Sequence, residues 1–289
     1  MTHQLHEQNR RSWNHATRAH NQHKGDQAAF LRGGGSTLFP EELGLLGDLH
    51  ERRVVHLQCN SGQDSLSIAA RGAQVTGVDI SDEAIEFARK LSSGSGITAQ
   101  FERADVYDWL ATTTATFDIV FASYGALCWL SDLPTWARGV ARVLAPGGRL
   151  VVVEFHPLLN LFDDSGRVTT DLMKGGGGGH IEWKPGVGDY VAASEGALPA
   201  GEHIASTQPY ENPEPSHEWE WSVPDVIDAV AQAGLRIERV REWPYSNGCR
   251  FFPSMVALDG KRWALSPDAP KVPCMYGLVA SRDRPNAGP

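Results

Sequence analysis

Several features that define large classes of protein are missing from this chain of 289 residues. No run approaches the roughly 18 apolar residues that a membrane-spanning helix needs. The start, MTHQLHEQNRRSW, lacks the apolar core of a signal peptide. A formal net charge of −9 argues against a nucleic-acid partner, because nucleic-acid grooves need clustered Lys and Arg. We therefore expect a cytoplasmic protein that binds neither a membrane nor a nucleic acid.

Cysteine is scarce and gives no sign of a structural role. The four cysteines are scattered with neither metal-ligand spacing nor a disulfide framework, and they are Cys59, Cys128, Cys249 and Cys274. His20 and His23 fall on one helical face, but no carboxylate or thiol near them in the sequence completes a ligand set. We therefore expect no metal site and a reducing environment.

Residues 54–81, VVHLQCNSGQDSLSIAARGAQVTGVDIS, carry the strongest local pattern. They predict a strand, a tight turn, a short helix and a second strand that ends at Asp79. This is half of a doubly wound nucleotide-binding fold, whose ligands lie at the carboxyl ends of the strands. A carboxylate there can accept hydrogen bonds from both hydroxyls of a ribose, which predicts an adenosine-like ligand.

The tight turn discriminates between adenosine ligands. A dinucleotide enzyme needs G-x-G-x-x-G so that the backbone can approach a pyrophosphate. This chain has Gln58, Asn60 and only one glycine, Gly62, at these positions. Side chains at the first two positions would obstruct a pyrophosphate, whereas S-adenosylmethionine has no phosphate and tolerates them. A nucleotide-dependent oxidoreductase is therefore the less favoured alternative.

The same segment resembles the first two motifs of class I S-adenosylmethionine-dependent methyltransferases. More narrowly, it is similar to bacterial small-molecule methyltransferases whose first strand reads HLQC-x-x-G-x-D. The segments FDIVFAS (117–123) and VLAPGGRLVVVEF (143–155) resemble the fourth and fifth motifs of the family. The resemblance covers residues 50–156 well. The family usually has an acidic residue where this chain has His56, so another residue must contact the amino group of the methionine half.

The resemblance implies a Rossmann-like three-layer α/β/α fold with a seven-stranded mixed sheet in the order 3-2-1-4-5-7-6. We expect the third to seventh strands over residues 98–103, 117–122, 149–155, 235–240 and 275–280. Residues 1–50 are expected to form an N-terminal helical cap, with helices over 9–23 and 40–50. Residues 51–289 form the methyltransferase domain. A lid is expected at 157–221, because this Gly- and Pro-rich insertion, with its run Gly175–Gly179, follows the fifth strand.

The resemblance also implies where the cofactor binds. Expected contacts come from the first four strand ends and from the cap, at Trp13, Ser36, Gln58, Cys59, Asn60, Gly62, Asp79, Ile80, Asp105, Val106 and Ser123. Asp105 matches the family position that faces the adenine amino group. For Trp13 and Ser36, an equally weighted alternative is a surface helix anchored by one tryptophan.

Aromatic residues predict the acceptor site. The chain has nine tryptophans, and several follow the carboxyl ends of strands or lie in the cap. Aromatic walls suit a flat, apolar acceptor, although any single ring is more often part of the core. The residues expected to contact the acceptor are His20, Trp129, Glu220, Trp221 and Tyr245. The expected acceptor is a phenol, an N-heterocycle or a cyclic dipeptide.

Methyl transfer from a sulfonium mainly requires that the acceptor atom be held about 3 Å from the methyl carbon, with water excluded. A general base helps when the acceptor is a hydroxyl or a protonated nitrogen. His156, at the end of the fifth strand, is the expected base, and Tyr124 is expected to orient the acceptor. Glu218 and Glu220 are weaker candidates, since strand alternation can turn them to solvent. The alternative for His156 is a structural residue that caps backbone groups.

We therefore predict an S-adenosylmethionine-dependent N- or O-methyltransferase of specialised metabolism, with S-adenosylhomocysteine as product. Its partner is expected to be a small-molecule acceptor, and the protein a monomer or homodimer. The competing hypothesis is a non-methylating protein on the same scaffold, such as a cyclase, a decarboxylase or a cofactor-binding module. Fold resemblance alone does not distinguish these activities.

Overall fold

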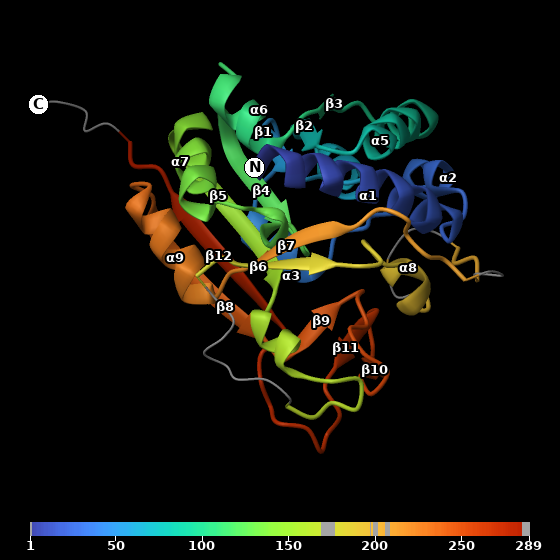
Figure 1. Cartoon of the computed structure of the whole chain (residues 1–289). Helices are drawn as coiled ribbons and strands as arrows, with labels where there is room; N and C mark the ends of the chain where they lie inside the picture. The colour runs from blue at the N-terminus through green and yellow to red at the C-terminus, as the bar shows by residue number, and fades with distance from the viewer. Residues whose placement is uncertain (1, 169–176, 197, 199–201, 206–208, 285–289) are drawn as a thin grey trace, which may run out of the picture.

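The computed structural model describes residues 2–168, 177–196, 198, 202–205 and 209–284. Gly175 and Gly176 of the predicted glycine run lie outside these residues. The centre of the molecule is a seven-stranded sheet in the order β3-β2-β1-β4-β5-β12-β8 (Figure 1). Its strands are β1 (Arg53–Leu57), β2 (Gln74–Asp79), β3 (Gln100–Arg103), β4 (Phe117–Ser123), β5 (Leu144–Phe155), β8 (Arg236–Trp243) and β12 (Met275–Ser281). In chain order this is 3-2-1-4-5-7-6, which confirms the predicted fold class.

The sheet is mixed because its last added strand reverses direction. β1 to β5 pair in parallel, whereas β12 runs antiparallel to both β5 and β8. β5 begins at Leu144 rather than at Arg149 as predicted, since Leu144 pairs with Phe117. β8 likewise continues past the predicted end at Val240 to Trp243, which pairs with Met275.

Helices cover both faces of the sheet and complete three layers. One face packs under α6 (Val106–Thr112), α7 (Leu133–Val143) and α9 (Val223–Gln232), around fully buried Trp136. The other packs under α3 (Pro40–Leu46), α4 (Gln63–Ala69) and α5 (Asp82–Ser95), with Leu46 and Ile68 in the core. The central strands are apolar on both sides, as buried parallel strands require.

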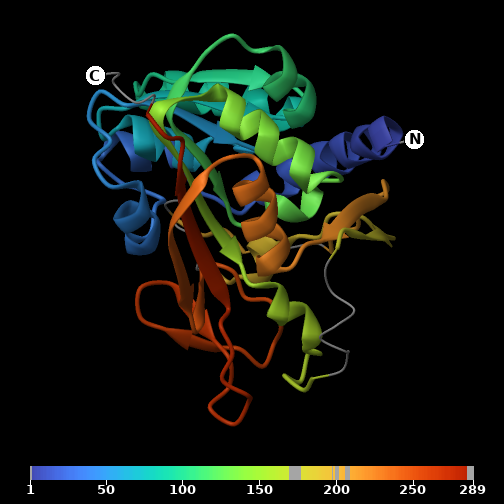
Figure 2. The same cartoon turned by 90° about the vertical axis from the view of Figure 1, so that its left-hand side faces the viewer.

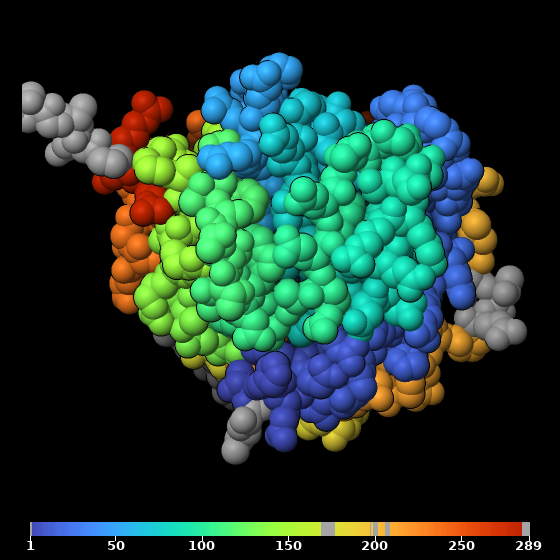
Figure 3. All heavy atoms as spheres, turned by 90° about the horizontal axis from the view of Figure 1, so that it is seen from above, coloured from blue at the N-terminus to red at the C-terminus, as the bar shows by residue number. Residues whose placement is uncertain are grey.

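The N-terminal segment differs in detail from the expectation. The first helix, α1 (Thr2–Gln22), is longer than the predicted 9–23, and a short α2 (Gln27–Arg32) follows an Asp26 N-cap. The predicted helix 40–50 ends early at Leu46, because Gly47 takes a positive φ of 61°. α1 contacts both α5 and β7 and so lies across the end of the sheet (Figure 1). Figure 3 shows the same segment in dark blue along one edge of the molecule.

Two smaller sheets follow the fifth strand, and sequence analysis missed their pairing. β6 (Gly179–Trp183) and β7 (Ser216–Glu220) form an antiparallel ribbon within the predicted lid, near α8 (Tyr190–Ala193). Between β8 and β12 the chain forms a three-stranded sheet that extends beyond the main sheet (Figure 2). Its strands are β9 (Tyr245–Asn247), β10 (Val256–Leu258) and β11 (Arg262–Ala264). Two 3-10 helices, η1 (Leu127–Trp129) and η2 (Pro157–Leu161), follow β4 and β5.

Among the described residues, no helix combines the length and the apolar character needed to cross a bilayer.

Candidate active site

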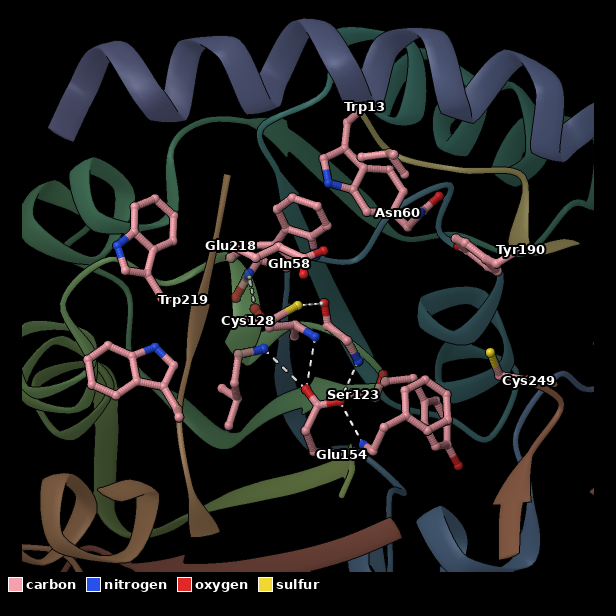
Figure 4. A pocket seen from close by; sticks show the side chains of 18 of the residues that line it. Trp13, Gln58, Asn60, Ser123, Cys128, Glu154, Tyr190, Glu218, Trp219 and Cys249 are labelled. Carbon is pink, nitrogen blue, oxygen red and sulfur yellow. Dashed lines mark hydrogen bonds between the residues drawn. The ribbon is translucent and has the colours of Figure 1, made fainter. Parts of the chain in front are cut away.

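A single large cavity of about 1530 Å³ lies at the carboxyl ends of the strands of the main sheet (Figure 4). We call the predicted cofactor contacts that lie on its sheet side the cofactor floor, and they are Gln58, Cys59, Asn60, Asp79, Ile80, Asp105, Val106 and Ser123. We call the opposite side the aromatic roof, which consists of Trp13, Trp183, Tyr190, Glu218 and Trp219, from α1, β6, α8 and β7.

The other predicted residues divide into two groups. Those that also line the cavity are Tyr124, Trp129, His156, Glu220 and Trp221. Those that do not are His20, Ser36, Gly62 and Tyr245. His20 is buried beneath Tyr190, with 4.2 Å between ring centroids, and Tyr245 donates to Glu41 Oε1 at 2.8 Å. These two side chains therefore support the cavity walls.

The turn after β1 has backbone conformations that favour glycine, although the family's glycines are replaced there. Gln58 and Asn60 have φ of 54° and 47°, a conformation that side chains other than glycine adopt infrequently. Side-chain hydrogen bonds hold them there: Gln58 Nε2 donates to Ala126 O at 2.6 Å, and Asn60 Oδ1 accepts from Ser61 N at 2.6 Å. Gly62 is needed for packing, because a Cβ there would lie 2.7 Å from Ala88 Cβ.

Asp79 has the geometry expected of a ribose anchor. Its two oxygens accept one backbone N–H each, from Asn60 and from Ser81, both at 2.8 Å. Burial raises the pKa of Asp79 to about 6, against the lowering effect of these backbone hydrogen bonds. A carboxylate offers about four acceptor positions, so two remain for the hydroxyls of a ribose.

Asp105 has a partner that sequence analysis did not predict. His6 Nδ1 of α1 lies 2.7 Å from Asp105 Oδ2, and Tyr107 N donates to Asp105 Oδ1 at 2.8 Å. Burial acts to raise the pKa of Asp105, but the hydrogen bond and charge of His6 outweigh it and lower the pKa. The carboxylate expected at the adenine amino group therefore also ties α1 to the floor.

His56 occupies the position that is acidic in the family. It is buried between Ser65 and Ser123, with Nδ1 2.9 Å from Ser65 Oγ and Nε2 3.4 Å from Ser123 Oγ. Burial lowers the pKa of His56 to about 3. The imidazole is therefore neutral at pH 7, and it supplies no charge of either sign to the cavity.

The predicted base, His156, lines the cavity but has both ring nitrogens engaged. Nδ1 accepts from Leu158 N at 3.2 Å at the start of η2, and Nε2 lies 3.3 Å from Glu242 Oε1. Burial lowers the pKa of His156, with Glu242 opposing. This geometry agrees with the alternative role weighed for His156, a cap on backbone groups at the end of the strand.

Tyr124 is held by the small sheet. Its hydroxyl accepts from Asn247 Nδ2 at 2.9 Å, and burial raises the pKa of Tyr124 well above its ordinary value. Its φ of 43° belongs to the left-handed region, a departure from ordinary strand geometry where β4 meets the cavity. The phenol is therefore a neutral group at a rigidly held position on the wall.

Glu154, which sequence analysis passed over, organises the loop after β4. Its carboxylate accepts the N–H groups of Gly125, Ala126 and Leu127, the last two at 2.9 and 3.1 Å, as the dashed lines in Figure 4 show. Burial raises the pKa of Glu154, although these hydrogen bonds lower it. An acidic residue inside the apolar strand VVVEF was the available signal, because a buried carboxylate requires such partners.

Glu218 faces the cavity, although strand alternation allowed it to face solvent. On β7, His217 and Trp219 contact α1: Asn9 exchanges two hydrogen bonds with the His217 backbone, and Trp219 packs edge-on against His6. Glu218 therefore points to the opposite side, near Gln58 and Cys128 in Figure 4, where its Oε2 accepts from Trp183 Nε1 at 2.9 Å. Burial, and to a lesser degree Glu220, raise the pKa of Glu218.

The remaining groups are aromatic rings and thiols. Trp13 contacts Trp129 edge-on, with ring centroids 5.3 Å apart, and Tyr190 at 6.5 Å. Cys59, Cys128 and Cys249 line the cavity as free thiols, and burial raises the pKa of all three. Within the described part of the chain, no group of three or more His, Cys, Asp or Glu side chains is placed to hold a metal ion.

Comparisons with known proteins match the segment of the chain that holds the floor. Residues 54–148 match the family model described as a methyltransferase domain. A ubiquinone biosynthesis O-methyltransferase of Xanthomonas oryzae is 35% identical over 103 residues, which cover 36% of this chain and 43% of that protein. A demethylmenaquinone methyltransferase of Thermus thermophilus is 33% identical over 108 residues, or 37% and 48% of the two chains. This chain thus spans less than half the length of these curated relatives.

Solved structures extend the likeness of the fold to most of the chain. An S-adenosylmethionine-dependent methyltransferase from Mesorhizobium loti superposes with a TM-score of 0.55 at 19% identity, covering 86% of this chain and 99% of that one. A second, from Listeria monocytogenes, gives 0.51 at 17% identity over 84% and 97%. Residues 54–148 therefore match a methyltransferase domain, and most of the chain shares the fold of these two S-adenosylmethionine-dependent methyltransferases.

Proposed function

We propose that the protein transfers the methyl group of S-adenosylmethionine to an oxygen or nitrogen atom of a small aromatic or heterocyclic molecule. The observation that carries this proposal is the continuity of the cavity, which joins the cofactor floor to the aromatic roof. Its volume of about 1530 Å³ exceeds the roughly 300–1,000 Å³ typical of a pocket for one ligand. The space therefore suits a cofactor and an acceptor together.

The floor residues fit the cofactor. Asp79 has two acceptor positions left for a ribose, and Gln58 Oε1 is buried without a hydrogen-bond partner in the described structure. A buried amide oxygen without a partner is costly, so a donor from a bound molecule would relieve it. We place the ribose at Asp79, the adenine beside Asp105 and Val106, and the methionine half along the turn at Gln58. When bound, the cofactor supplies an electrophilic methyl group on a sulfonium.

The protein's own contribution is mainly positioning and exclusion of water. Trp13 and Trp129 enclose the acceptor side, which favours a flat ring and keeps water from the methyl group. Glu218 is the residue that we propose accepts the proton of a hydroxyl or N–H acceptor. Its carboxylate faces the floor near Gln58, and its raised pKa makes it a stronger base than an exposed glutamate.

The proposed chemical class of the acceptor is inferred from the residues of the aromatic roof. The family model matches residues 54–148, which hold the whole floor and none of the roof, and the two curated relatives align over only 103 and 108 residues. The name of the Xanthomonas relative, an O-methyltransferase, favours oxygen as the methylated atom, whereas the name of the Thermus relative specifies no atom. The substrates of those proteins are not carried over to this chain. A phenol, an N-heterocycle or a cyclic dipeptide fits the aromatic walls. We further propose that the protein acts in the cytoplasm, in specialised metabolism, as a monomer or homodimer.

Two measurements test the proposal. Isothermal titration should show that S-adenosylmethionine and S-adenosylhomocysteine both bind without added metal. Incubation with methyl-labelled cofactor and a panel of phenols, N-heterocycles and cyclic dipeptides should then place label in a product. Cofactor that binds but is never consumed would favour the non-methylating alternative. Binding of NAD with no response to S-adenosylmethionine would favour an oxidoreductase.

A further inference from the structure

Lys24 places an uncompensated positive charge at the cavity. It follows α1 in the chain and lines the cavity next to α4 residues Gln63 and Asp64. No hydrogen bond or ion pair joins its ammonium group to any residue that the structure describes. Burial lowers the pKa of Lys24 to about 8, and Asp64 opposes this shift. The ammonium group lies at the cavity wall without a partner, and an anionic ligand there would supply one.

Asp64 supplies the opposite charge on the same part of the wall. It lies in the first turn of α4, immediately after the β1 turn, and one of its oxygens accepts from Thr37 Oγ1. Burial raises the pKa of Asp64, while Thr37 and then Lys24 lower it. The two charges are close enough to influence each other but form no ion pair. Each therefore keeps the capacity to bind a ligand group of its own.

The position of Lys24 and Asp64 relative to the cofactor floor indicates which part of the ligand they contact. The β1 turn joins Asn60, which donates to Asp79, directly to the start of α4 and Asp64. Tyr190 of the roof lies within electrostatic range of both Asp64 and Asp79. The charged pair thus borders the ribose site on the side of β1, and Asp105 lies on the other side, after β3. A ligand that extends from the ribose site past the β1 turn would reach the part of the wall that Lys24 and Asp64 line.

We propose that Lys24 and Asp64 bind the α-amino-acid end of the cofactor, with the Lys24 ammonium on its carboxylate and Asp64 on its ammonium group. The assignment rests on the proposed use of S-adenosylmethionine. It names the residues that replace the missing acidic residue at His56, whose neutral imidazole cannot bind an ammonium group by charge. Among the described cavity-lining residues, the other strong cation, Arg250, is already engaged by Glu195 and by Pro253 O.

Three ligands that differ only at this end test the proposal. S-adenosylhomocysteine carries both charges, its decarboxylated form carries only the amino group, and 5′-methylthioadenosine carries neither. Titration calorimetry on the full chain should show that Lys24→Met weakens S-adenosylhomocysteine by about 10–100-fold and leaves the other two unchanged. Asp64→Asn should weaken both amino-bearing ligands and leave 5′-methylthioadenosine unchanged. Lys90→Met, at an exposed lysine of α5, is the matched control.

The remaining outcomes overturn the proposal and can be told apart from a failure of the proposed function. Equal weakening of all three ligands would show that Lys24 acts through the fold, and unchanged S-adenosylhomocysteine binding would show that it has no role. Either result refutes the assignment while cofactor binding stands. A wild-type protein that binds none of the three ligands would instead refute the proposed function. Thermal unfolding of each variant separates loss of contact from loss of structure.

Discussion

The cofactor floor and the aromatic roof enclose one cavity but are built in different ways. The floor lies on parallel strands, and its groups are held by bonds between neighbouring strand ends, such as Asn60 N to Asp79. The roof is assembled from segments far apart in the chain, since the Asn9 side chain bonds the His217 backbone across 208 residues. Its shape therefore depends on how α1 docks.

This difference separates two kinds of specificity. The floor coincides with the segment that matches the methyltransferase domain model, and its polar groups fit a cofactor shared by many enzymes. The roof lies outside that segment and presents rings and one carboxylate. Under the proposed function, the floor binds the cofactor and the roof contacts the acceptor. The predictions below test that division.

The largest effect is expected for the roof residue Glu218. Glu218→Gln should lower kcat by about 10²–10⁴-fold, because the amide cannot take a proton from the acceptor. Cofactor affinity should change little. The wild-type rate should rise with pH through an apparent pKa above the ordinary glutamate value of about 4.3, in the direction of the shift. Glu182→Gln on β6, an exposed position, is the control. Full activity of the Glu218 variant would assign the base elsewhere.

The largest floor effect should follow Asp79→Ala. Removing the charged acceptor should cost about 2–4 kcal/mol of cofactor affinity, with kcat at saturation nearly retained. Asp79→Asn, which keeps one acceptor oxygen, should lose less. Both dissociation constants are measurable by calorimetry, with thermal unfolding as a check because Asp79 also accepts from Asn60 and Ser81. Unchanged affinity would show that the ribose binds elsewhere.

Asn9→Ala tests how the roof is held. The change leaves the buried N–H and C=O of His217 without partners, which should cost about 2 kcal/mol of unfolding free energy. Hydrogen exchange of the β7 amides should accelerate, and the KM for the acceptor should rise. Gln22→Ala, at the exposed end of the same helix, should do neither. A roof that stays protected in the Asn9 variant would mean that β7 is held independently of α1.

His156→Ala should affect stability more than catalysis. Loss of the cap on Leu158 N should cost about 1 kcal/mol, within the range for caps generally, while kcat changes only a few-fold. The motif analysis alone predicted a loss of about 10²–10⁴-fold for a general base. Circular dichroism and kinetics on the same preparation decide between the two, and a large fall in kcat with normal folding would restore His156 as the base.

The smallest effect concerns the tie between α1 and the floor. The pKa of Asp105 is lowered, so its stabilising contribution is complete above the unfolded value of about 3.9 and is lost as pH falls through the lower folded value. The difference in unfolding free energy between wild type and Asp105→Asn should therefore be constant near neutral pH and shrink below about pH 4. A difference that does not depend on pH would show that the charge has no part in docking α1.

Sequence analysis predicted the region of the floor better than the region of the roof. The order of the main sheet was predicted, because motifs such as HLQCNSG and FDIVFAS encode a strand and the turn that follows it at short range. Sheet-side residues such as Ala104 and Glu154 line the cavity but were not predicted. The roof was predicted less well, since the pairing of β6 with β7 depends on chain segments that no local pattern links. The direction of the Glu218 side chain could not be predicted, because it follows from the contacts that His217 and Trp219 make with α1. The sequence did not point to Lys24, because the lack of a hydrogen bond or ion pair at its ammonium group is a property of the folded chain.

Three thiols on the cavity wall can report chemically whether a ligand occupies the cavity. Cys59, Cys128 and Cys249 line the cavity, and their raised pKa values keep them protonated and slow to alkylate at neutral pH. Any alkylation that does occur there requires the reagent to enter. Mass spectrometry of labelling rates, with Cys274 outside the cavity as an internal reference, should therefore report how freely small molecules reach the cavity. Protection of Cys128 by a ligand would identify an acceptor without knowledge of the product.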